Sequence, residues 1–155
     1  MLTQPQITQT KATHAAVIHL TIPREDIRKV MGPSYHELMA TIEAQGIKPV
    51  GPWFSHHLKM DPKTFDFEIG VPVDKPIEVS GRVKPGELPS AKVVRTVYRG
   101  GYEGLPTAWG EFEAWIEKEG LKTAPNLWEV YAKGPESGPD PEQWETELNR
   151  PLEKS

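Results

Sequence analysis

The chain has 155 residues, of which 37% are hydrophobic and 26% charged, and its formal net charge is −4. This length suits one domain with a substantial core, and the 16 prolines and 13 glycines argue against a helical bundle or coiled coil. The negative charge provides no basic surface for phosphate backbones, so nucleic-acid binding is not expected. The absence of cysteine from the sequence excludes disulfides, thiolate metal sites and cysteine nucleophiles.

The first residues carry no pattern for export or membrane insertion. Residues 1–13 are polar and without periodicity, so we expect a flexible tail before a single domain at 14–155. They lack the charged and then apolar segments of a secretory signal. No apolar run in the sequence approaches the roughly 18–20 residues of a spanning helix. The sequence therefore predicts a cytoplasmic protein without membrane association.

The predicted domain begins with a strand and a helical region. Residues 17–22 alternate apolar and polar side chains, which is typical of a half-buried strand. A helix is expected to follow Pro23, since proline is favoured at the first helical position. Gly32-Pro33 is expected to interrupt it, so that a second helix starts near Ser34 and ends at Gly46.

Strands and turns are predicted for the rest of the first half. Phe65 to Val73 alternates most regularly, because Asp66 and Glu68 lie between apolar residues that share one face. Pro85 and Gly86 favour turns. The other segments expected here are strands at 52–60 and 77–83, followed by a loop at 84–89.

The second half follows a similar order. A strand at 91–98 leads through Gly100-Gly101 to a helix that ends at Gly120. Its apolar stripe consists of Leu105, Trp109, Phe112 and Ile116. Further strands are predicted at 128–132 and 144–148.

Matching residues at matching places indicate an internal repeat, at about 14–83 and 90–152. Tyr35 and Tyr102 each precede a leucine by three residues, and each helix ends at a glycine. Glu68 and Glu147 each precede a proline by four residues. Chance similarity between alternating segments is the alternative. The repeat predicts an α+β fold of two strand-helix-strand-strand units related by a pseudo-two-fold axis. Its antiparallel sheet would carry the helices on one side, with a central groove for a ligand.

Several short motifs, in this order, are similar to one known family. Arg99-Gly-Gly-Tyr-Glu-Gly-Leu105, Trp128-Glu-Val-Tyr131, Gly134-Pro135 and Thr146-Glu-Leu-Asn-Arg-Pro-Leu152 resemble the GyrI-like small-molecule-binding family. That family includes the effector-binding domains of AraC-type and multidrug-responsive regulators. Gly51-Pro-Trp-Phe54 and Asp66-Phe-Glu-Ile-Gly-Val-Pro-Val73 resemble its first half, so that the similarity covers about residues 15–152.

The resemblance implies an apolar, aromatic-walled cavity between the two repeats. A buried glutamate on the cavity floor commonly meets cationic aromatic ligands in that family, and Glu129 occupies the matching position. Some stand-alone members are associated with hydrolysis of cyclopropane-bearing, DNA-alkylating natural products. The chain resembles the stand-alone members, since the motifs leave no stretch for a helix-turn-helix.

Strand periodicity makes Glu129 the main candidate for chemistry. It shares a face with Leu127 and Tyr131, and burial of that face would raise the pKa of its carboxyl group. Such a group can attract a desolvated cation or act as a general acid or base. Tyr131 and Tyr102 would add aromatic faces and hydroxyl groups. The alternatives are a solvated Glu129 face and a Tyr102 that only packs on the sheet.

Aromatic residues near Glu129 are candidate pocket walls. Trp109 and Phe112 would form one wall, and Trp53 and Phe54 the opposite one, although a helix stripe is more often core. Glu111 neighbours the stripe and could approach the cavity mouth. Trp115, Trp128 and Trp144 are expected in the core or on the outer sheet face.

The histidines do not predict a metal site. His56 shares a face with Phe54, and we favour a hydrogen-bonded structural role for it over pocket lining. His56 and His57 point to opposite faces of a strand, and no histidine pair has ligand spacing. We therefore expect no metal and no cofactor.

The leading hypothesis is binding of amphipathic, aromatic, often cationic small molecules, for sequestration or sensing. The alternative is a hydrolase in which Glu129 and Tyr131 act on a strained electrophile. An adaptor that binds another protein is a third class, which the sequence permits without indicating.

Overall fold

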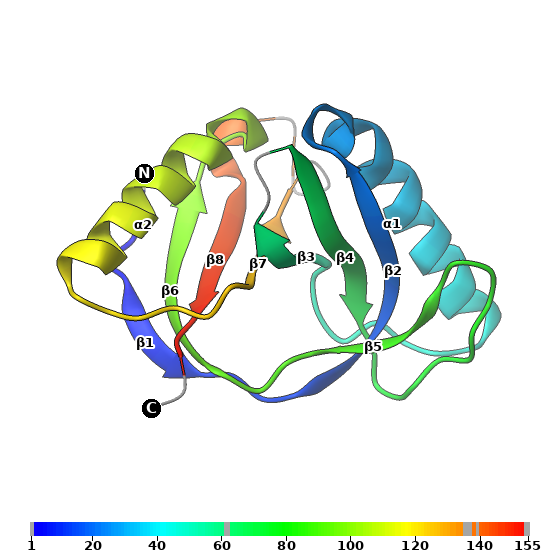
Figure 1. Ribbon diagram of the computed structural model, residues 1–155. Coiled ribbons are helices and arrows are strands. Elements are labelled where there is room, and N and C mark those ends of the chain that lie inside the picture. The colour runs from blue at the N-terminus through cyan, green and yellow to red at the C-terminus, as the bar shows by residue number, and fades with distance from the viewer. Residues whose placement is uncertain (1, 61–62, 135–137, 139, 154–155) are drawn as a thin grey trace.

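The computed structural model describes residues 2–60, 63–134, 138 and 140–153. Within them, eight strands form one antiparallel sheet in the order β1-β6-β8-β7-β3-β4-β2-β5, and two helices cover it (Figure 1). No helix in these ranges is long and apolar enough to cross a membrane. The strands are β1 Gln6–Gln9, β2 Thr13–Pro23, β3 Phe54–Met60, β4 Thr64–Pro72, β5 Lys84–Leu88, β6 Lys92–Arg99, β7 Leu127–Lys133 and β8 Glu145–Pro151; the helices are α1 Ile27–Ala44 and α2 Leu105–Lys118.

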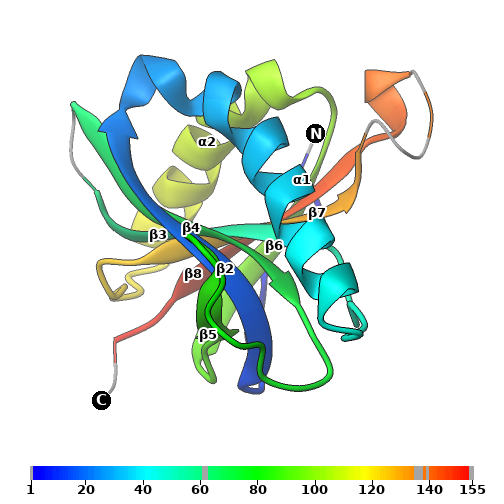
Figure 2. The same ribbon diagram turned by 90° about the vertical axis from the view of Figure 1, so that its right-hand side faces the viewer.

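Two units of the same order make up the sheet. The first is β2-α1-β3-β4 and the second is β6-α2-β7-β8, and the sheet order places them symmetrically about the central pair β3–β7. Figure 2 shows that α1 and α2 lie on the same side of the sheet. The predicted α+β fold of two strand-helix-strand-strand repeats is confirmed.

Both helices end in the same way. Gly46 and Gly120 adopt φ angles of 68° and 70°, a left-handed conformation that costs glycine little. The next residues donate backbone N–H groups across the last turn, from Ile47 to the Ile42 carbonyl (3.1 Å) and from Leu121 to the Ile116 carbonyl (3.2 Å). The glycines of the predicted repeat therefore mark equivalent helix ends.

Strand register locates the pseudo-two-fold axis. Phe54 and Trp128 each lie eight residues after the helix-ending glycine of their unit. Phe54 pairs with Val130, and Trp128 pairs with His56, so an exchange of the two units converts one pair into the other. The pair between them, Ser55 with Glu129, is converted into itself. The axis therefore passes through the Ser55–Glu129 pair.

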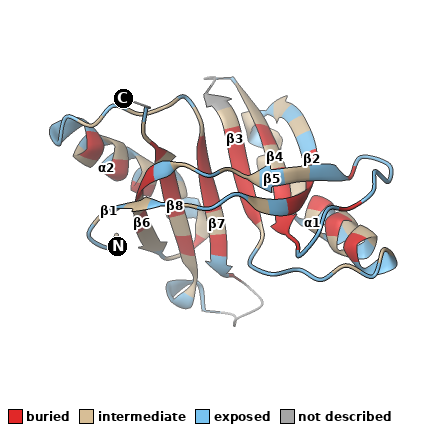
Figure 3. Ribbon diagram, turned by 90° about the horizontal axis from the view of Figure 1, so that it is seen from below, coloured by how far each residue is buried: buried red, intermediate tan, exposed pale blue. Residues whose placement is uncertain are grey.

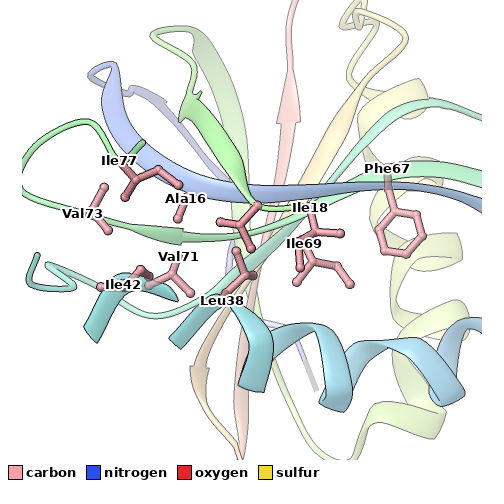
Figure 4. Close-up of a cluster of buried hydrophobic side chains, with 10 residues drawn as sticks. Ala16, Ile18, Leu38, Ile42, Phe67, Ile69, Val71, Val73 and Ile77 are labelled. Carbon is pink, nitrogen blue, oxygen red and sulfur yellow. The ribbon is translucent and has the colours of Figure 1, made fainter. Parts of the chain in front are cut away.

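Apolar clusters anchor each helix to its own unit. Under α1, Leu38 and Ile42 pack against Ile18, Phe67 and Ile69 of the sheet, all at most 1% exposed (Figure 4). The cluster under α2 is smaller and contains Val94, Ala108, Phe112, Ile116 and Leu148. On the other face of the sheet, Ala15, Val17 and Phe54 form a third cluster, against which Leu88 and Val130 pack. The centre of the sheet between the helices is left to more polar residues.

The N-terminal segment is part of the sheet, so the prediction of a flexible tail over 1–13 is wrong. Gln6–Gln9 pairs with β6, and the Thr3 N–H group donates to the Val97 carbonyl (3.0 Å). Beyond it, the connections β1–β2 and β5–β6 run across the underside of the sheet (Figure 3) and are joined by the Thr10 N–H to Ala91 carbonyl bond (2.8 Å). Backbone hydrogen bonds along a strand edge form this strand, and they leave no side-chain periodicity to read.

Helix α1 is continuous, contrary to the expected interruption at Gly32-Pro33. Pro33 is exposed, and so its missing N–H removes one helical hydrogen bond on the solvent side. Leu38 and Ile42 hold the following turns on the sheet. The anchoring of those turns outweighs the local cost of the proline.

The strand after β4 lies later than predicted. Ile77 and Val83 are buried, but the chain between them turns at Gly81, whose φ is 58°, and forms no named strand. The strand is β5, Lys84–Leu88, within the stretch expected to be a loop. It pairs with β2 at the edge of the sheet, where the missing N–H of Pro85 can be tolerated.

Candidate functional site

Glu129 lies at the centre of the molecule, on the face of the sheet that carries the helices. Its register partners are Ser55 on β3 and Leu148 on β8. Ser55 and Leu148 are fully buried and Glu129 is 9% exposed. The face that contains Glu129 is therefore enclosed, as the first interpretation of the strand pattern expected.

Three side chains donate hydrogen bonds to the Glu129 carboxylate. The Trp109 indole Nε1–H, from α2, donates to Oε2 at 2.6 Å. The Tyr131 hydroxyl donates to Oε1 at 2.9 Å, and Ser55 Oγ lies 3.5 Å from the same oxygen. Ser55 Oγ and the Tyr131 hydroxyl are 2.7 Å apart. One carboxylate oxygen is thus bound from within the sheet and the other from a helix.

Burial dominates the electrostatics of this group. Loss of water raises the pKa of Glu129, and the hydrogen bonds from Trp109, Tyr131 and Ser55 oppose that shift in part. Burial, together with the neighbouring carboxyl group, raises the pKa of Tyr131 well above its usual value. The ion pairs found among the described residues all lie elsewhere. Within that part of the chain, Glu129 has hydrogen-bond donors but no countercharge.

A row of aromatic rings runs beside the carboxylate. Trp53 lies between Tyr35 of α1 and Tyr131 of β7, with 4.7 Å between ring centroids on each side. Tyr102 continues the row, 5.8 Å from Tyr131 and 5.1 Å from Trp144. Tyr131 is 5% exposed, whereas the other four side chains are partly exposed. We call these five residues the aromatic row.

Four of the predicted residues gather around Glu129. Tyr131 and Trp109 contact its carboxylate, and Trp53 and Tyr102 flank Tyr131 in the aromatic row. Phe112 lies behind them, fully buried in the α2 cluster with its ring 5.7 Å from that of Trp109. Phe112 therefore supports Trp109 from the core.

Two predicted residues of β3 lie on the wrong face. Phe54 belongs to the cluster on the opposite side of the sheet, with its ring against Gly70. His56 shares that face, where its Nε2 lies 2.9 Å from Asn126 Nδ2 and its ring meets Trp128 edge-on at 5.5 Å. We therefore correct the prediction that they line a pocket with Glu129. Neighbouring residues of a strand point to opposite faces, so Trp53 and Phe54 could not share one wall.

Glu111 is also outside the site. It is exposed on α2 and lines a surface hollow of about 230 Å³ with Leu2–Pro5, Phe112 and Trp115. A second hollow, of about 310 Å³, is bounded by residues of the N-terminal segment and β6. Neither hollow includes Glu129, which the surrounding side chains cover.

Sequence reasoning missed Ser55, Tyr35 and Trp144. The repeat contained a signal for two of them, because Ser55 corresponds to Glu129, and Tyr35 lies eleven residues before its helix-ending glycine, as Trp109 does in the second half. Trp144 was assigned to the core or the outer sheet face, but it stacks beside Tyr102. Of the quoted motifs, Pro135 lies outside the described residues. Within the described part of the chain, no group of three or more His, Cys, Asp or Glu side chains could hold a metal ion.

Comparisons with solved structures find the same fold. The crystal structure of the EcmrR C-terminal domain superposes on this chain with a TM-score of 0.85 at 20% sequence identity, and the match covers 98% of each of the two chains. In the EcmrR–DNA complex, the chain spans 58% of the EcmrR subunit, with a TM-score of 0.84 at 21% identity. SAV2435, solved bound to tetraphenylphosphonium, has a TM-score of 0.72 at 16% identity over 97% of this chain and 94% of its own.

Sequence comparison identifies the family. None of the curated proteins matches the chain. The GyrI-like small molecule binding domain, however, matches residues 3–153, nearly the whole length. The two-repeat sheet and the helix arrangement agree with that match. The chain therefore belongs to the GyrI-like small molecule binding domain family.

Proposed function

We propose that the protein binds aromatic, preferably cationic small molecules over the β3–β7 pair, with Glu129 as the charged group. The observation that carries this proposal is a carboxylate enclosed beside aromatic rings and without a countercharge among the described residues. A ligand that brings a positive charge would compensate the cost of keeping this carboxylate ionised away from water.

The aromatic row supports the same ligand class. Tyr35, Trp53, Tyr102 and Trp144 are partly exposed, so they can offer ring faces to a ligand while Tyr131 holds the acid. Ring faces attract cations, with about 0.5–2 kcal/mol per contact. Tetraphenylphosphonium, which SAV2435 holds in its solved complex, combines charge and aromatic surface and is the natural first probe. A neutral aromatic ligand of similar size would gain the apolar contacts alone.

Titration with tetraphenylphosphonium tests the proposal, with binding measured by calorimetry and by tryptophan fluorescence. We expect the parent to bind and Glu129→Gln to lose at least tenfold in affinity. The matched control is Glu68→Gln, which removes a carboxylate from β4 at the register position opposite His56, on the other sheet face. Equal affinity of the parent and Glu129→Gln would reject the role of the charge.

A second candidate function is hydrolysis of a strained electrophile. The observation that favours it is the hydrogen-bonded set of Glu129, Tyr131 and Ser55, in which burial raises the pKa of the acid toward the range useful for proton transfer. Glu129 would protonate the leaving group or activate the attacking water. The Tyr131 hydroxyl would hold the Glu129 carboxyl group in place through its hydrogen bond. Incubation with a cyclopropane-bearing alkylating compound should then yield a water adduct by mass spectrometry. A stoichiometric complex without turnover, or an unchanged rate in Glu129→Gln, would exclude this reaction.

A further inference from the structure

The two oxygens of the Glu129 carboxylate have partners that differ in burial. Oε1 accepts from Tyr131 and Ser55, which belong to the central strands and are at most 5% exposed. Oε2 accepts from the Trp109 indole at 2.6 Å, and Trp109 is a partly exposed side chain on the surface of α2. A rotation about the Trp109 side chain would release Oε2, whereas release of Oε1 would disturb the sheet.

The orientation of the indole decides its role. Trp109 turns the edge that carries its N–H toward the carboxylate, and this edge is a hydrogen-bond donor without acceptor capacity. Its ring also leans on Phe112, which is fixed in the core. In this arrangement the indole takes the position on Oε2 that a ligand N–H group would need. Because Glu129 is only 9% exposed, a donor on the ligand reaches Oε2 by displacing the indole that covers it.

We infer that Trp109 is the specificity-determining residue of the site, an internal competitor that disfavours ligands with N–H donors and leaves delocalised cations without donors as the preferred class. The inference rests on the proposed function. A cation with N–H groups gives up hydrogen bonds to water on entry and must displace the indole to regain one. A cation without such groups has no hydrogen bonds to lose and interacts with the carboxylate through its charge alone.

A matched pair of ligands tests this selectivity. 10-Methylacridinium and 9-aminoacridinium are flat cations of similar size, and only the second carries N–H donors. We expect the parent to bind 10-methylacridinium at least as tightly as 9-aminoacridinium. In Trp109→Phe, which keeps a ring and removes the donor, affinity for 9-aminoacridinium should rise about tenfold, the equivalent of one charge-assisted hydrogen bond. Affinity for 10-methylacridinium should stay within about threefold.

The control variant is Trp115→Phe, which alters another partly exposed tryptophan of the same helix and the same cluster. It should leave both affinities unchanged. If Trp109→Phe weakens both ligands, Trp109 is a stacking wall and the inference is wrong while the proposed function stands. If neither the parent nor Trp109→Phe binds either cation, both proposals are wrong.

A measurement on the unmodified protein checks the contact itself. The indole N–H resonance of Trp109 should lie downfield in a proton–nitrogen NMR spectrum, because the bond to Oε2 is short and charge-assisted. It should move upfield in Glu129→Gln. Saturation with 9-aminoacridinium should also move it upfield, whereas 10-methylacridinium should leave it downfield. A resonance that responds equally to both ligands would contradict displacement by the N–H group.

Discussion

The two halves of the molecule place different chemistry on equivalent backbones. Ser55 and Glu129 face each other across the pseudo-two-fold axis, and His57 is the first-half equivalent of Tyr131. His57 stacks on Phe67 with ring centroids 5.0 Å apart and planes 9° apart, within apolar surroundings. Tyr131 instead donates its hydroxyl to Glu129. The repeat therefore determines where the side chains lie, and the residue at each position determines whether it packs or binds.

The helices show the same division. α1 is the longer helix and covers the larger buried cluster, with Leu38 and Ile42 at its centre. α2 covers a smaller cluster and also supplies Trp109 to the carboxylate. The acid and two of its donors come from the second half, while the first half contributes Ser55. The second half therefore supplies the charged group, whereas the first half supplies Ser55 and two rings of the aromatic row, Tyr35 and Trp53.

The two central strands also respond to pH in opposite directions. In β3, burial lowers the pKa of His56 and of His57 to about 4, and for His57 the charges of His56 and Arg24 add to the effect. In β7, burial raises the pKa of Glu129. Burial therefore disfavours protonation of His56 and His57 in the first half, and it disfavours ionisation of Glu129 in the second half.

The largest effect is expected in the scaffold. Leu38→Ala should lower the free energy of unfolding by about 2–5 kcal/mol, because Leu38 is fully buried between α1 and the sheet and the smaller side chain leaves a cavity. Leu38→Met, which nearly conserves volume, should cost less than about 1.5 kcal/mol. Urea denaturation measures both. Calorimetry on the folded Leu38→Ala protein should give an unchanged affinity for tetraphenylphosphonium, and a tenfold loss would contradict the scaffold role.

Acid should destabilise the protein through the histidines of β3. As the pH falls below 6.5, unfolded chains bind protons that the folded His57 refuses until about pH 4, so the free energy of unfolding falls across that window. The full shift corresponds to about 3 kcal/mol. His57→Phe should remove this contribution, which gives a shallower decline in urea denaturation between pH 7 and pH 4. The control is His14→Gln, at an exposed position. If the free energy of unfolding falls equally steeply with pH in His57→Phe and in the parent, the assignment to His57 is wrong.

Glu129 should produce the opposite trend. Because its pKa is higher in the folded state, the unfolded chain loses its proton first as the pH rises, and the folded state is progressively disfavoured up to the folded-state pKa. Glu129→Gln has no proton to lose, so it should gain stability relative to the parent as the pH rises above the usual pKa of a glutamate, about 4. Each unit of pKa difference corresponds to about 1.4 kcal/mol. A stability difference that stays constant with pH would count against this mechanism.

Much of this comparison could be predicted from the sequence, because periodicity reports which residues of one element share a face. The helix ends at Gly46 and Gly120 follow from local patterns, and alternation shows which residues share a face with Glu129, although not whether that face is buried. Edge strands β1 and β5 do not, because backbone pairing forms them and their side chains show no alternation. The direction of the Trp109 N–H group likewise cannot be predicted from the sequence, because it depends on how α2 packs over β7.

The error at Trp53 and Phe54 has a different origin. The prediction places both residues on one wall, although strand geometry sends neighbours to opposite faces. Register across the β3–β7 pair resolves the choice, since Ser55 faces Glu129 and Phe54 faces Val130. Chemical similarity is therefore a weaker guide to a strand than its alternation.

The smallest expected effect concerns one of the side-chain contacts between the halves. Ser55→Ala removes the bond between Ser55 Oγ and the Tyr131 hydroxyl, at 2.7 Å, and should cost about 1 kcal/mol of stability in urea denaturation. The cost stays small because the Tyr131 hydroxyl still donates to Glu129 and Trp109 still binds Oε2. Affinity for tetraphenylphosphonium should change by less than about threefold. If Ser55→Ala instead abolishes binding while the fold survives, the Ser55–Glu129 pair acts as one unit in ligand binding.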